Sequence, residues 1–326
     1  MYDYELQKAL LLEHIEKSKL RRAVWCLAIP CAVFYFVTLF WGQAAISFLA
    51  LFGINAQKAI TVLNDAGILQ IVSIVLSLFL MTVPFAICCN IADCKVSQIG
   101  GFKRAKSGTA LPYYLFGIGF CAFANIAVNV ASEIFESFGF HYSMPHDKNP
   151  DGVFGFLLVI ISTVLVPALV EEFAFRGIVL GLLRPFGEGF AIICSSVVFG
   201  LLHGNFEQIP FAFLVGLILS LIRIKTDSLL VCMAVHATNN LISVLASYSS
   251  GMPAVLSNLV YTVYILFALV LSVLALSLLK GKDGFVLNKY SGVLKPAKLY
   301  RGFFLSPAII ILAVLFLLRA VTYLAV

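Results

Sequence analysis

Residues 154–183 read FGFLLVIISTVLVPALVEEFAFRGIVLGLL, and this stretch decides the fold class. A helix needs about 20 apolar residues to cross a bilayer, and this run is longer than that. The same run carries three charged side chains, Glu171, Glu172 and Arg176. Each ion near the centre of a membrane helix costs about 2.5–3.5 kcal/mol on insertion scales. Charges placed there at such a cost indicate a functional site inside a membrane protein.

The rest of the chain has the same apolar character. Of its 326 residues, 61% are hydrophobic and 12% are charged, whereas soluble domains carry about 25% charged residues. Further apolar runs occur at 23–41, 68–89, 111–131, 190–203, 209–224, 229–246, 255–279 and 303–320. Together with 154–183, they predict an all-α, multi-pass membrane helical bundle of about 8–9 transmembrane helices, with the lipid bilayer as its solvent.

Some segments are too short to span a bilayer fully. The runs 190–203 and 209–224 predict half-immersed helices around a polar cavity, and the run 44–54 predicts an interfacial segment. Residues 1–22 predict a cytoplasmic N-terminal segment whose apolar side chains suit the membrane surface. We expect residues 23–326 to form a single membrane domain, and residues 154–246 to be the core that holds its functional site.

The positions of the basic residues predict the orientation. With the N-terminus inside, eighteen of the 22 Lys and Arg residues fall in inside segments, three, at 58, 148 and 319, fall outside, and Arg176 lies within the run 154–183. Cytoplasmic loops of membrane proteins are rich in Lys and Arg, so we expect a cytoplasmic N-terminus. The membrane we expect is the plasma membrane of a bacterium. Because these residues form short tracts between apolar runs, the net charge of +6 does not indicate nucleic acid as a partner.

The spacing within the charged stretch separates the roles of its members. Glu172 and Arg176 stand four residues apart, on one face of a helix and in the favourable order for an ion pair. Glu171 lies about 100° further round the helix and is left free for chemistry. Pro167, one turn earlier, removes a backbone hydrogen bond and is expected to disturb the helix near the site.

Two later runs supply partners for Glu171. The stretch Phe199-Gly-Leu-Leu-His203 places an aromatic ring and an imidazole one turn apart, and His236 and Asn240 share a face at the same spacing. At about 1.5 Å per residue, Glu171 and His203 lie about 20 Å from the inner ends of their helices, and His236 about 10 Å. We therefore expect the groups to meet near mid-membrane, in a cavity reached from the inside.

These residues resemble the signature motifs of the CPBP family, also called the CAAX protease and bacteriocin-processing or Abi family. The first motif, EExxxR, corresponds to Glu171, Glu172 and Arg176. The second, FxxxH, runs from Phe199 to His203, and the third, HxxxN, runs from His236 to Asn240. The three motifs follow one another in the family's order. The resemblance covers about residues 154–246.

The resemblance implies an intramembrane endopeptidase with a cavity that opens to the cytosol. It implies an active centre of four residues: Glu171, His203, His236 and Asn240. Three more residues would support them: Glu172, Arg176 and Phe199. The family includes Ras-converting endopeptidases that trim prenylated CAAX proteins, and bacterial members linked with bacteriocin immunity and peptide maturation. The expected partner is therefore a membrane-associated peptide or protein, either prenylated or a precursor peptide.

The mechanism expected from these groups is direct attack by water. Glu171 and His203 activate the water, while His236 and Asn240 stabilise the oxyanion. No metal cofactor is favoured, since the sequence lacks HExxH, in which one helix carries two His ligands and a base. Zinc bound by Glu171, His203 and His236 is the alternative, which also suits the ligand preferences of that metal.

Two other classes of function remain open. A non-catalytic membrane scaffold or bacteriocin-immunity protein would keep the fold and bind a partner without needing Glu171. A proton-coupled transporter would use buried Glu and His as a relay. A relay predicts ionisable groups strung along a path, whereas here they cluster in one central block, which favours the protease.

Overall fold

The computed structural model describes residues 2–55, 58, 67–92, 94, 96, 101–105, 108–142, 152–248, 253–280 and 285–325. The first half of the chain holds α1 (Tyr2–Ala50), α3 (Ile68–Leu80), α4 (Val83–Ile91), α6 (Ala110–Ser137), β1 (His141–Tyr142), α7 (Gly152–Val159) and η1 (Ile160–Leu165). Next come α8 (Val166–Glu172), η2 (Phe173–Val179), α9 (Leu180–Leu183), η3 (Arg184–Phe186), α10 (Glu188–Leu202) and α11 (Gln208–Thr226). The last elements are α12 (Leu229–Tyr248), α13 (Ala254–Leu279), α14 (Pro296–Phe304), α15 (Pro307–Val321) and β2 (Leu324–Ala325).

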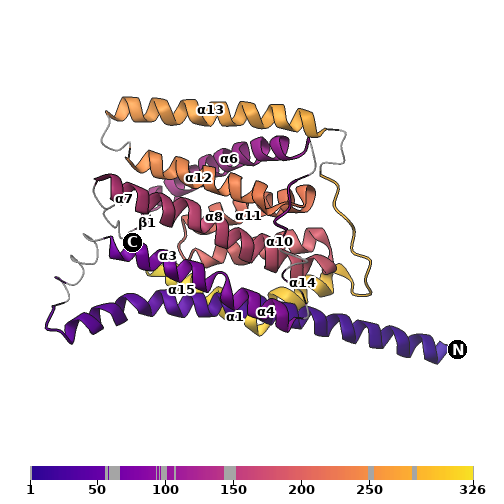
Figure 1. Cartoon of the computed structure of the whole chain (residues 1–326). Helices are drawn as coiled ribbons and strands as arrows, with labels where there is room; N and C mark the ends of the chain where they lie inside the picture. The colour runs from indigo at the N-terminus through magenta and orange to yellow at the C-terminus, as the bar shows by residue number, and fades with distance from the viewer. Residues whose placement is uncertain are drawn as a thin grey trace.

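The helices run side by side along a common direction, and the two ends of the chain lie at opposite ends of the bundle (Figure 1). Among the described residues, 7 helical segments are long and apolar enough to cross a membrane, or up to 8 if α14 and α15, bent by 52°, form one span. Helix α10, with 15 residues, is apolar but shorter. The all-α, multi-pass bundle is thereby confirmed. The run 190–203 lies mostly in the shorter helix α10, as expected, whereas the run 209–224 lies in α11, which is long enough to span and so differs from the half-immersed helix expected there.

Helix α1 is longer than the sequence indicated. It is a single helix of 49 residues that includes residues 2–22, the first apolar run and residues 44–50. The expectation of a separate interfacial segment at 44–54 is therefore wrong for residues 44–50, which continue α1. No Pro or Gly lies within residues 44–50 to end the helix there. Pro30 lies inside α1 without ending it, because a membrane helix tolerates the loss of one backbone bond when neighbouring helices pack around it.

Contacts between loops define one end of the bundle, which we call the basic end. The backbone N–H of Leu229 donates to the carbonyl of Gly101 over 2.9 Å, and the N–H of Asn288 donates to Glu188 over 2.8 Å. The hydroxyl of Tyr290 donates to Glu16 over 2.6 Å. Most described Lys and Arg residues lie on this side, in the N-terminal half of α1, in the loops, in α14 and in the adjoining helix ends: Lys17, Lys19, Arg21, Arg22, Lys103, Arg104, Arg184, Arg223, Lys225, Lys280, Lys289, Lys295, Lys298 and Arg301.

The opposite end of the bundle carries the small sheet, so we call it the sheet end. There β1 and β2 pair antiparallel, with His141 opposite Ala325. Arg319, near the end of α15, donates to the hydroxyl of Thr38 on α1 over 3.2 Å. Two of the described basic residues belong to this end, Lys58 and Arg319, so the two ends of the bundle differ strongly in charge.

Close helix packing positions the later motifs. Helices α10 and α11 form a hairpin in which a Cβ on Gly200 would lie 2.9 Å from the carbonyl of Ile209, and a Cβ on Gly216 would lie 2.9 Å from Ser196. Small residues allow membrane helices to approach this closely without a hydrophobic driving force from water. The approach fixes the C-terminal end of α10, where His203 begins the connection to α11.

Candidate active site

The helix that carries the first motif is irregular on both sides of its charged residues. Two π-helical segments, η1 and η2, flank the short helix α8, which holds Pro167 and both glutamates. Such π-helical turns occur frequently at functional sites. Proline has no N–H to offer the carbonyl four residues earlier, which is that of Thr163. The side chain of Asn240 donates to this carbonyl over 2.9 Å, so α12 supplies the bond that Pro167 cannot make.

Glu172 is the centre of a buried ionic cluster. Its Oε1 accepts from Nη1 of Arg176 over 3.0 Å, as the four-residue spacing predicted. The same oxygen lies 2.9 Å from Nδ1 of His236 on α12. The side chains of Glu172 and Arg176 are 0% and 1% exposed. Because the carboxylate accepts at Nδ1, it fixes the orientation of the imidazole and leaves Nε2 of His236 directed away from it.

Phe199 connects the second motif to this cluster. Its ring lies under the guanidinium of Arg176, with 4.1 Å between Cζ and the ring centroid, a geometry that favours cation–π attraction. Its backbone carbonyl lies 2.9 Å from Nδ1 of His203. A carbonyl can only accept, so Nδ1 of His203 carries the proton and Nε2 of the neutral ring has a free lone pair. Phe199 thus supports Arg176 with its ring and orients His203 with its backbone.

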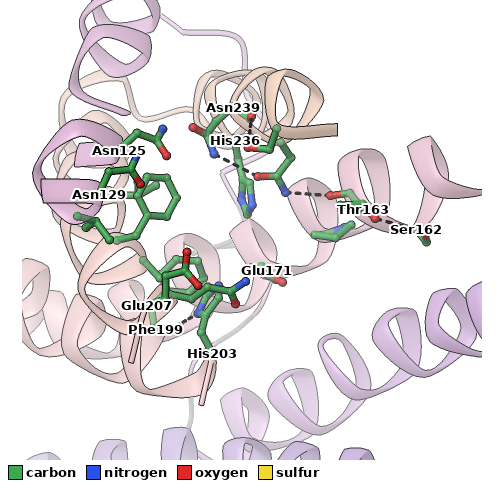
Figure 2. A pocket seen from close by; sticks show the side chains of 18 residues that line it. Asn125, Asn129, Ser162, Thr163, Glu171, Phe199, His203, Glu207, His236 and Asn239 are labelled. Carbon is green, nitrogen blue, oxygen red and sulfur yellow. Dashed lines mark hydrogen bonds between the residues drawn. The ribbon is translucent and has the colours of Figure 1, made fainter. Parts of the chain in front are cut away.

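All four residues expected in the active centre line one cavity, of about 520 Å³. Glu171, His203 and His236 point into a common space (Figure 2). Asn240 lines the same cavity and is held by its bond to the carbonyl of Thr163. Of the supporting residues, Phe199 also lines the cavity. Among the residues that the structure describes, none donates a hydrogen bond to the carboxylate of Glu171, which is therefore available to a ligand, as its position on the helix indicated.

The cavity has further polar residues that the motifs did not reveal. They come from four helices or their ends: Asn125, Asn129, Ser162, Thr163, Glu207, Gln208, Asn239 and Ser243. The side chain of Asn239 donates to Oδ1 of Asn240 over 3.3 Å. A second cavity of about 200 Å³ reaches Glu171 and His203 from the side of α1 and α15, and Arg319 lines it. Asn125 and Asn129 had a sequence signal, two amides four residues apart in an apolar run.

The packing toward the basic end bears on how this cavity is reached, which the sequence predicted to be from the inner ends of the helices. Between the cavity and the basic end, the helices are packed against one another by fully buried side chains: Ala174, Phe175, Arg176, Ile178, Val179, Leu180, Leu183, Ala191, Cys194, Leu219, Ile222, Leu229 and Cys232. The depth estimate placed Glu171 about 20 Å from the inner surface, and that distance is occupied by packed side chains.

Glu171, His203 and His236 are the residues that would hold zinc in the alternative mechanism. Nε2 of His203 and Nε2 of His236 are the nitrogens not held by Phe199 and Glu172, so each ring offers the atom that zinc would bind. Within the described ranges, however, no three His, Cys, Asp or Glu side chains are grouped closely enough to hold a metal ion.

Fold and site together define a class of protein, a multi-pass helical membrane protein with carboxylate, imidazole and amide groups around an intramembrane cavity. Within that class, residues 153–242 match the family model described as type II CAAX prenyl endopeptidase, Rce1-like. The matched segment contains all three motifs, so the resemblance to the CPBP family is confirmed there. The match supports an intramembrane protease in general terms. Comparisons with curated proteins and with solved structures gave no match.

Proposed function

We propose that the chain is an intramembrane endopeptidase that hydrolyses peptide bonds of membrane-associated or precursor peptides with a water activated by Glu171 and His203. The observation that carries this proposal is the shared cavity of about 520 Å³, in which an uncommitted carboxylate and an imidazole with a free Nε2 face the same space. Two such groups can hold one water molecule between them and accept a proton from it.

The reaction needs no covalent intermediate. The carboxylate of Glu171 takes a proton from water, whose oxygen lies within reach of Nε2 of His203, and the hydroxide attacks the scissile carbonyl carbon. The C–N bond of the tetrahedral intermediate then breaks, and the proton passes from Glu171 to the departing amine. The proton taken from water thus ends on the new amine, and the hydroxide stays on the acyl carbon as part of the new carboxylic acid.

The oxyanion requires donors on the other side of the cavity. His236 serves as one donor when its ring carries both protons, with Nδ1–H bonded to the carboxylate of Glu172 and Nε2–H directed into the cavity. Asn240 keeps one amide hydrogen beyond the one used at Thr163. Preorganised donors of this kind stabilise developing negative charge in a site from which water is excluded.

The orientation and the chemistry are parts of the same proposal. We place the N-terminus and the basic end in the cytoplasm, in accordance with the distribution of Lys and Arg. Metal-free catalysis is preferred, with zinc as the alternative that metal analysis decides. A scaffold or immunity protein without catalysis is the other candidate, and it predicts that function survives the loss of Glu171.

Comparative mass spectrometry of peptides tests the proposal. Membrane and secreted peptides are compared between cells that make the wild type, Glu171→Gln, or Glu207→Gln, in which a carboxylate at the rim of the same cavity is changed. We expect peptide termini that are present with the wild type and Glu207→Gln and absent with Glu171→Gln. Identical peptides in all three cultures, with the proteins present in equal amounts, would refute proteolysis by this site.

A further inference from the structure

We propose that the catalytic cavity opens to the extracytoplasmic side of the membrane, so that the substrate is a peptide segment presented from outside. This inference rests on the proposed function for the identity of the reaction, but the direction of opening has evidence of its own. That evidence is the position of the cavity lining along each helix and the distribution of charge between the two ends of the bundle.

The lining lies on the sheet-end side of the catalytic groups in two helices, and in the half nearer the sheet end in a third. On α12, which begins at the basic end, the lining runs from His236 onward to Asn239, Asn240 and Ser243. On α6, which also begins at the basic end, it comprises residues 125, 128 and 129 in the second half of the helix. On the helix that runs the other way, Ser162 and Thr163 precede Glu171 and therefore also lie toward the sheet end.

Exposure follows the same direction. Thr163, Asn129 and Ser243 are exposed, whereas the cavity-facing side of α12 nearer the basic end is closed by buried Val235 and Cys232. Buried amides and hydroxyls need hydrogen-bond partners, either in the protein or in water. Polar side chains that become more exposed toward one end therefore mark that end as the place where water and substrate enter. The cavity is therefore blind toward the basic end and open toward the sheet end.

The charge of the two ends then gives the side of the membrane. Short loops rich in Lys and Arg remain in the cytoplasm, and the described loops of that kind lie at the basic end. The sheet end consequently faces outward, and the entrance with it. A peptide reaches Glu171 from the exterior surface or from the outer half of the bilayer, which excludes a C-terminus presented from the cytosol.

The entrance also indicates the chemistry of the peptide. Its lining offers neutral amides and hydroxyls, which complement the N–H and C=O groups of an extended backbone. Among the described residues that line the larger cavity, Glu207 is the one charged side chain outside the catalytic group, and no described Lys or Arg lines it.

Labelling of introduced cysteines tests the direction of opening without any activity assay. Ser243→Cys places a thiol in the entrance, and Lys289→Cys places one in the exposed loop at the basic end. Val244→Cys, next to Ser243 but buried at 5% exposure, is the matched control, and the wild type measures labelling of the eight native cysteines. A membrane-impermeant maleimide is applied to intact spheroplasts and, separately, to inside-out vesicles.

We expect Ser243→Cys to be labelled in spheroplasts alone, Lys289→Cys in inside-out vesicles alone, and Val244→Cys in neither. Labelling of Ser243→Cys from the inside, from both sides or from neither side would overturn the inference, as would labelling of Lys289→Cys in spheroplasts. The result does not depend on peptide cleavage, so an outward-facing cavity in a protein that cleaves nothing would refute the proposed function and leave this inference standing.

Discussion

The substitution Glu172→Gln tests the role of the buried ionic cluster. It preserves the size of the side chain but removes the negative charge that faces Nη1 of Arg176 at 3.0 Å and Nδ1 of His236 at 2.9 Å. The guanidinium is 1% exposed, so water cannot replace the lost partner. Removing one member of a buried ion pair costs about 3–5 kcal/mol. We expect the unfolding free energy of the purified protein, measured by denaturant titration in detergent, to fall by about that amount.

A second variant separates the stability effect from the catalytic one. Adding Arg176→Met to Glu172→Gln removes both charges, and an apolar replacement of a buried pair is often neutral for stability. The double variant should regain most of the lost stability but should cleave slowly, because His236 still lacks the carboxylate that orients it. Glu207→Gln, at an exposed carboxylate, serves as the control. Wild-type stability in Glu172→Gln, or a double variant no more stable than the single one, would refute this reasoning.

Three further predictions concern neighbouring parts of the site. Asn240→Ala should destabilise the protein by about 1–3 kcal/mol, because it leaves the carbonyl of Thr163 unpaired; adding Pro167→Ala, which restores a backbone N–H, should recover stability in the same denaturant titration but not the cleavage rate. Phe199→Leu should cost about 1–3 kcal/mol through the lost ring and the space it leaves, yet change the cleavage rate less than tenfold, since the backbone carbonyl that orients the imidazole is unchanged. Exhaustive chelation should leave cleavage intact, and His236→Ala should slow it without altering metal content by elemental analysis; stoichiometric zinc that is lost and restored together with activity would contradict the metal-free mechanism.

Much of the architecture could be predicted because lipid imposes simple rules. Every backbone group must be satisfied within a helix, so each long apolar run became a helix. The limits of α1 could not be predicted, because runs of moderate hydrophobicity such as 44–54 can continue a helix or lie at the interface, and tertiary packing decides between them. The Glu172–Arg176 pair was predicted correctly because four-residue spacing acts within one helix.

The contacts between helices could not be predicted from spacing. Glu172 and His236 are 64 residues apart in sequence, and nothing local indicates that they bond. The same holds for Asn240 and Thr163, although Pro167 indicates that the carbonyl of Thr163 needs a donor. Sequence spacing could not predict the direction in which the cavity opens either, because depth along a helix gives the level of a group and not which side of that level is packed.

The rate at which a reconstituted Glu171→Gln variant cleaves a peptide tests the central claim most directly. The peptide is one found by the comparative mass spectrometry, and the wild type and Glu207→Gln are assayed beside it in liposomes at equal amounts of folded protein. If Glu171 takes the proton from the attacking water, its replacement should slow cleavage by at least about a hundredfold, while Glu207→Gln stays within a few fold of the wild type. Cleavage by Glu171→Gln at the wild-type rate would contradict the account.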